Sequence, residues 1–140
     1  MSETTTAAGK SFQFELVSPE QVLSSEPAAM VVVPGDAGDF GVLADHAPLL
    51  SSLRPGVVDI HGADGSRKRV FVAGGFADVG NNTCSVLAEE AVPVAELNTA
   101  DLDQQLKNLG EDMGLATDAL EKRKIESKMS IVRAKIAAAA

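Results

Sequence analysis

Apolar and polar side chains alternate along the first two thirds of the chain. The clearest case is FQFELV, Phe12–Val17, where every second residue is apolar. Such alternation is typical of a strand with one buried face. Further strands are predicted at other short apolar or alternating runs, namely Ala28–Val33, Gly56–Ile60, Lys68–Ala73, Phe76–Val79 and Thr83–Ala88.

Turn-forming residues separate these predicted strands. Residues 62–65 (Gly-Ala-Asp-Gly) and residues 80–82 (Gly-Asn-Asn) each lie between two strand-like runs. Gly and Asn tolerate the positive φ of tight hairpin turns, so we expect two hairpins. Many short strands at this spacing indicate a sandwich or barrel. The pair Gly74-Gly75 predicts a bulge or turn within it.

After Pro93 the period changes to that of an amphipathic helix. Leu102, Leu106, Leu109 and Met113 are spaced four, three and four residues apart. Asn98 or Thr99 can cap this helix at its start, and Gly114 is a plausible end. We therefore predict two domains, a β domain at residues 11–95 and a helical domain at residues 98–140.

A second helix is predicted within the C-terminal domain. Asp118, followed three residues later by Glu121, resembles a capping box. Two helices joined by a short turn form a helical hairpin. The apolar stripe of this second helix consists of Leu120, Ile125, Met129, Val132 and Ile136.

Composition narrows the class of protein. The sequence has 140 residues, 45% of them hydrophobic, as in a globular protein. No apolar run approaches the roughly 18 residues that a membrane-spanning helix needs. The start, MSETTTAAGKSF, carries neither a signal nor a transit pattern. A lone cysteine, Cys84, fits a reducing compartment, so we expect a cytosolic protein.

The net charge of −8 lies in the first 97 residues. Residues 1–97 carry 13 acidic and 5 basic residues, whereas residues 98–140 carry 7 of each. Binding to a nucleic-acid backbone requires clustered Lys and Arg. We therefore expect no nucleic-acid partner.

The run from Pro34 to Leu50 gathers most of the candidate chemistry. Its Asp36, Asp39, Asp45 and His46 resemble metal ligands or an acid–base pair. However, no second His/Cys/Asp cluster has metal-ligand spacing, and no phosphate-binding loop is present. We expect no catalytic site, no metal and no cofactor. Two interpretations remain: a solvated surface turn, or a loop that binds another protein through neighbours such as Phe40.

Three ordered motifs carry a resemblance to a known family. They are VPGDAGDFGVLADHAPLLSSLRPGVV (33–58), FVAGGFADV (71–79) and VLAEEAV (86–92). Together they resemble the epsilon subunit of the rotary F-type ATP synthase, whose mitochondrial counterpart is called delta. The resemblance implies a flattened sandwich of two antiparallel sheets, with about ten strands, followed by two helices. It also implies a non-catalytic rotor subunit that joins gamma to the ring of c-subunits.

The resemblance implies a role for particular residues. Asp39 and His46 match positions that meet polar loops of the c-ring, and we expect an acidic tip to meet basic groups there. Ser18, Leu50 and Val57 match positions that face gamma. The hairpin is implied to reach the alpha and beta subunits. The expected location is peripheral, on the cytoplasmic face of a bacterial inner membrane, without insertion into it.

The sequence departs from the family in the hairpin. Some members bind ATP through a Leu/Ile-Asp-x-x-Arg-Ala motif, and here the ungapped match is Leu97-Asn98-Thr99-Ala100-Asp101-Leu102, with Asp in the place of Arg. Because Asp repels a triphosphate, we expect no nucleotide site. Gly110 and Gly114 each weaken an extended helix by roughly 1 kcal/mol, so we expect at most weak inhibition of hydrolysis. The rival hypothesis is an unrelated adaptor domain that binds a soluble partner.

Overall fold

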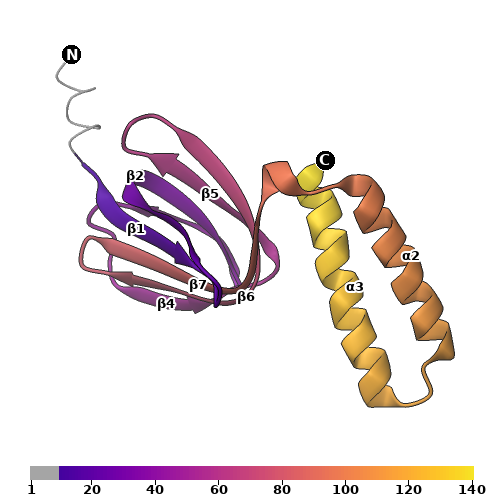
Figure 1. Cartoon of the computed structure of the whole chain (residues 1–140). Helices are drawn as coiled ribbons and strands as arrows, with labels where there is room; N and C mark the ends of the chain where they lie inside the picture. The colour runs from indigo at the N-terminus through magenta and orange to yellow at the C-terminus, as the bar shows by residue number, and fades with distance from the viewer. Residues whose placement is uncertain (1–9) are drawn as a thin grey trace. The chain divides into compact units, whose positions relative to one another are not determined.

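The computed structural model describes residues 10–140, so residues 1–9, where no signal or transit peptide is expected, lie outside it. Two compact units make up the protein, one ending at Pro93 and one running from Val94 to Ala140 (Figure 1). The elements are β1 (Phe12–Val17), β2 (Val22–Gly35), β3 (Gly38–Leu43), β4 (Leu49–Ser52), β5 (Gly56–Gly62), β6 (Arg67–Gly80), β7 (Thr83–Pro93), the 3₁₀ turn η1 (Val94–Glu96), α2 (Thr99–Leu115) and α3 (Ala119–Ala139).

Five strands of the first unit close into a flattened barrel. Strand β1 pairs with β2, β2 with β5, β5 with β6, and β6 with β7, all antiparallel. The last pair, β7 with β1, is parallel. In a closed circuit of five strands not every neighbouring pair can be antiparallel, because five is odd, so at least one pair must be parallel. The predicted class, a sandwich followed by a helical hairpin, is confirmed, while the expectation of purely antiparallel sheets is wrong at this pair.

Residues 10–140 form seven strands where about ten were expected, because some strands run through both layers. In β6, residues 67–72 pair with β5 and residues 76–79 pair with β4. In β2, the N-terminal half pairs with β1 and the C-terminal half with β3. If such strands are counted once in each layer, the observed number of strands approaches the expected number of about ten. The core between the layers is built of aliphatic and Phe side chains, among them Phe12, Phe14, Leu16, Val31, Val33, Val58, Ile60, Val72, Val79 and Val86.

Gly74 and Gly75 mark the point where β6 turns over. Both have positive φ, 74° and 103°. Core residues are even-numbered before them, as at Val72, and odd-numbered after them, as at Val79. The register with β7 is unchanged across the pair, so this is not the predicted bulge. A Cβ on Gly75 would lie 1.9 Å from the Leu87 carbonyl oxygen, so the close approach of the two strands requires glycine here.

The two helices of the second unit begin at the predicted caps. The Asn98 side chain accepts a hydrogen bond from the Asp101 amide (3.2 Å), and the Asp118 side chain accepts one from the Glu121 amide (2.7 Å). The Glu121 carboxylate bonds to the Thr117 amide instead of completing the reciprocal box. Leu120 is 57% exposed, so its placement in the apolar stripe of α3 is wrong.

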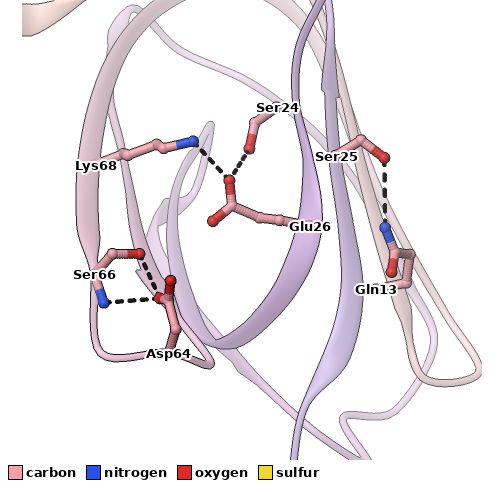
Figure 2. A network of polar contacts seen from close by, with 7 residues as sticks. All are labelled: Gln13, Ser24, Ser25, Glu26, Asp64, Ser66 and Lys68. Atoms are coloured by element: carbon pink, nitrogen blue, oxygen red, sulfur yellow. Dashed lines mark hydrogen bonds and ion pairs between the residues drawn. The ribbon is translucent and has the colours of Figure 1, made fainter.

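A polar network joins β2 to the β5–β6 hairpin (Figure 2). The Glu26 carboxylate accepts hydrogen bonds from Lys68 Nζ (2.8 Å) and Ser24 Oγ (2.7 Å). These two bonds, led by that of Lys68, hold the pKa of Glu26 below its ordinary value of 4.5. Asp64 closes the turn by accepting from the amide and hydroxyl of Ser66. The network therefore links β2 to β6, two strands that are not paired with each other, through ionised groups.

Candidate interaction surfaces

Asp39 lies in a strand, because β2 and β3 form a hairpin with a two-residue turn at Asp36-Ala37. Asp39 pairs with Pro34 across this hairpin, and its side chain is 60% exposed. The Arg54 guanidinium holds it: Nη2 donates to Asp39 Oδ1 at 2.5 Å. The other guanidinium nitrogen, Nη1, donates to the Gly35 carbonyl at 2.8 Å. Sequence reasoning missed both strand β3 and the Arg54 contact.

The end of β4 and the residues that follow it fasten this hairpin turn. The Asp36 amide donates to the Ser52 carbonyl (2.9 Å), and the Arg54 amide donates to the Pro34 carbonyl (3.0 Å). A Cβ on Gly35 would meet Phe40, Ser51 and backbone at about 3 Å, so the turn is also tightly packed. We call the β2–β3 turn together with Asp39 and Arg54 the hairpin tip. Its backbone is held on both sides.

His46 lies in the short connection between β3 and β4. Its Nδ1 lies 2.6 Å from the Ala47 carbonyl oxygen, which assigns the proton to Nδ1. The His46 amide donates to the Leu43 carbonyl, and Asp45 takes a positive φ of 67° to make this tight turn. The Asp45 carboxylate oxygen Oδ2 lies 3.9 Å from Lys10 Nζ. Across residues 10–140, no three His, Cys, Asp or Glu side chains gather closely enough to hold a metal ion.

Leu50 belongs to an exposed apolar surface on the outside of one layer. Leu50 lies in β4, where it pairs with Asp78 of β6, and it is 67% exposed. Phe76 and Leu87 form a cross-strand pair on the same side, exposed by 42% and 41%. We call these three side chains the apolar face. Sequence reasoning missed Phe76 and Leu87, although strict alternation with the buried Ala77 leaves Phe76 outside.

The three residues expected to face gamma do not form one patch. Ser18 is only 9% exposed, its amide and hydroxyl both bond to the Gln21 carbonyl, and it lines a shallow groove of about 310 Å³ beside Phe76. Leu50 lies on the outside of the same layer. Val57 lies on the outside of the other layer, because its neighbour Val58 points into the core.

Both units match family models in consecutive order. The β-sandwich domain of the ATP synthase delta/epsilon family matches residues 11–94, and the C-terminal domain of the ATP synthase epsilon subunit matches residues 98–140. The protein belongs to the ATP synthase delta/epsilon family. The resemblance carried by the three sequence motifs is thereby confirmed.

Curated relatives and solved structures agree with this membership. The ATP synthase epsilon chains of Rhodospirillum centenum and Rhodospirillum rubrum are 47% and 44% identical, covering 89% and 99% of this sequence and 88% and 98% of theirs. A subunit of the Euglena gracilis mitochondrial ATP synthase has the same fold with a TM-score of 0.82, at 23% identity over 93% of this sequence and 82% of that one. A subunit of the Tetrahymena thermophila mitochondrial enzyme gives 0.65 at 16% identity, covering 91% and 96%.

In the hairpin of this epsilon-family protein, the residues that replace those of the ATP motif have structural roles at the start of α2. Asn98, at the position of the motif's Asp, caps α2 by accepting from the Asp101 amide. Asp101 itself is exposed in the first turn, where a carboxylate suits the helix dipole. The position of the motif's Arg is thus occupied by an anion. Among the described residues, no helix combines the length and apolar character needed to cross a membrane.

Proposed function

We propose that this protein is a non-catalytic subunit of the central rotor stalk of a proton-translocating F-type ATP synthase, joining gamma to the c-ring. The observation that carries the proposal is the match of both family models, in order, across the sandwich and the hairpin. The two structural neighbours come from assemblies described as OSCP/F1/c-ring and central stalk/c-ring. The protein would act by mechanical coupling, peripherally at the cytoplasmic face of the bacterial inner membrane.

The c-ring contact is assigned to the hairpin tip and to His46. Asp39 lies in β3 and His46 lies in the short connection between β3 and β4, so both precede β4 in the sequence. The hairpin tip is fastened by backbone hydrogen bonds to Ser52 and Pro34, so a force applied there is transmitted to the barrel. A stiff support suits a contact that transmits torque through several modest interactions.

The gamma contact is assigned to the apolar face, with Ser18 at its margin. Leu50, Phe76 and Leu87 expose large apolar side chains on one side of a single layer. Exposed contiguous apolar groups on a soluble domain mark surfaces that a partner covers. Val57 is retained as a separate gamma contact on the other layer, to be tested by itself.

The hairpin is assigned a minor regulatory role through the alpha and beta subunits. From Asp118 onward α3 carries six basic residues against three acidic ones, Asp118 included. Basic side chains on an exposed helix can meet acidic loops of another subunit. Gly110 and Gly114 both lie inside α2 in the folded hairpin, so their cost of roughly 1 kcal/mol each relative to Ala is already present there and does not distinguish the two forms. Packing of α2 on α3, with Leu102 and Val132 buried, disfavours an extended inhibitory form that would expose such side chains.

The double variant Asp39→Lys with His46→Asp tests the proposal. Membranes depleted of this subunit and reconstituted with the variant should hydrolyse ATP but pump protons poorly, because the c-ring contact is lost. Binding to gamma and the thermal unfolding of the isolated variant should stay as in the parent. Normal proton pumping by the double variant would contradict the assignment of these residues to the c-ring.

A further inference from the structure

The hairpin tip contains an internal ion pair at the place where an acidic contact was expected. Arg54 donates to Asp39 through one guanidinium nitrogen and to the Gly35 carbonyl through the other. The pair joins residues 15 positions apart, and both side chains remain partly exposed, 42% for Arg54 and 60% for Asp39. Asp39 therefore does not face its partner as an isolated negative charge.

This pairing changes what happens when a partner covers the tip. Removing a carboxylate from water is costly unless a counterion and hydrogen bonds accompany it. Arg54 supplies the counterion from within the same polypeptide, so a partner need not supply it. It also fixes the Asp39 side chain in one orientation before binding, which lowers the entropy cost of association. The remaining carboxylate oxygen, Oδ2, can still accept a hydrogen bond.

The partner surface that fits such a tip is polar but uncharged. A cationic partner group would meet Arg54 as well as Asp39, and like charges at an interface oppose binding. Amides, hydroxyls and backbone N–H groups can donate to Asp39 without meeting this repulsion. This partner chemistry differs from the basic groups that the sequence led us to expect at the tip.

We propose that Arg54 is the positioning residue and internal counterion of the c-ring contact, and that the contacted loops present neutral hydrogen-bond donors at Asp39. This inference rests on the proposed function, because it takes the tip to be the c-ring contact. It adds a residue and a partner chemistry that the family match does not supply. It also predicts that the contact depends only weakly on ionic strength.

A binding cycle with the purified c-ring in detergent and the complex of gamma with this subunit tests the inference. The variant Arg54→Gln leaves Asp39 ionised and unpaired, so its affinity for the c-ring should fall about tenfold. Arg54→Lys should lie between, because an ammonium keeps the charge but not the two-pronged geometry. The double variant Asp39→Asn with Arg54→Gln removes both charges and should recover most of the affinity.

Two readouts separate this role from simple support of the fold. Dissociation constants at about 0.05 M and about 0.5 M KCl should differ little in the parent and more in Arg54→Gln, because only the variant carries an unpaired charge. Arg67→Gln is the matched control: it removes another Arg–Asp ion pair, in which Arg67 is 59% and Asp59 20% exposed. Arg67 lies opposite His61 at the other end of β5, so this variant should leave c-ring affinity unchanged.

The opposite sign would overturn the inference. If the c-ring presents cations, Arg54→Gln should bind more tightly, because a repelling charge has been removed, and the parent should show a steep salt dependence. Unchanged binding by Arg54→Gln, or a double variant that stays weak, equally refutes the counterion role. Failure of the proposed c-ring site has a different signature, since Asp39→Lys with His46→Asp would then bind like the parent and the inference would fall with it.

Discussion

Replacing Leu50 by Ala should weaken binding to gamma while leaving the sandwich folded. Leu50 is 67% exposed, so most of its side chain gains burial only when a partner covers the apolar face. Fully burying a Leu side chain stabilises by about 1.5–3 kcal/mol, and two thirds of that is about 1–2 kcal/mol. A loss of this size corresponds to a roughly 5- to 30-fold increase in the dissociation constant. The buried third predicts a loss of folding stability of only about 0.5–1 kcal/mol.

The assay is a titration of gamma-containing catalytic complex that lacks this subunit, with thermal unfolding of each isolated variant alongside. Leu43→Ala is the matched control, because Leu43 is 56% exposed but lies in β3 on the other layer. It should bind gamma like the parent. If Leu50→Ala and Leu43→Ala bind equally well, the apolar face is not the gamma contact. Val57→Asp, measured in the same titration, shows whether the second layer takes part.

Three further outcomes are expected. Lys68 and Ser24 lower the pKa of Glu26 in the folded state, so ionised Glu26 adds stability above its ordinary pKa of 4.5, and this stability is lost as pH falls through the lower folded value. The melting temperature of Glu26→Gln should therefore change less than that of the parent on acidification from about pH 5 to about pH 3. Equal slopes of melting temperature against pH would contradict this. Calorimetric titration with Mg-ATP should show no saturable binding, because Asp101 stands in the place of the motif's Arg; a micromolar site would show that the phosphates are held elsewhere. Deletion of residues 98–140 should raise ATP hydrolysis by the assembled enzyme about twofold or less, because an extended form would expose apolar side chains that the hairpin buries, such as Leu102 and Val132; a rise of about tenfold would mean that the extended form is well populated.

Features set by neighbouring residues could be predicted from the sequence. Strand β1 begins and ends at the predicted residues, Phe12 and Val17, because alternation is a local property of one strand. Both hairpins form where Gly and Asn allow positive φ, as at Asn82 with φ of 59°. The caps Asn98 and Asp118 were also found, since a cap bonds to an amide only three residues away.

Features that join distant residues could not be predicted in this way. The parallel pairing of β1 with β7 follows from closure of the barrel, which no single stretch of sequence specifies. The ion pair of Asp39 with Arg54 depends on a fold that brings two separate segments together. Val57 and Leu50 looked equivalent in sequence, but layer assignment depends on which strand each one pairs with. The family match supplied candidate residues and not their arrangement.

The placement of the candidate sites follows from the topology. Strands β3 and β4 are the two strands outside the five-stranded barrel, each added to one member of it. Asp39 lies in β3, Leu50 lies in β4, and His46 lies in the segment between them. The circuit of five paired strands closes without β3 and β4. Val42 and Leu53 of the segment from Asp36 to Arg54 belong to the core, whereas the exposed residues of this segment can carry contacts at little cost to it. We therefore expect substitutions of exposed residues in this segment to change binding more than stability, whereas substitutions at Gly75, inside the barrel, should do the reverse.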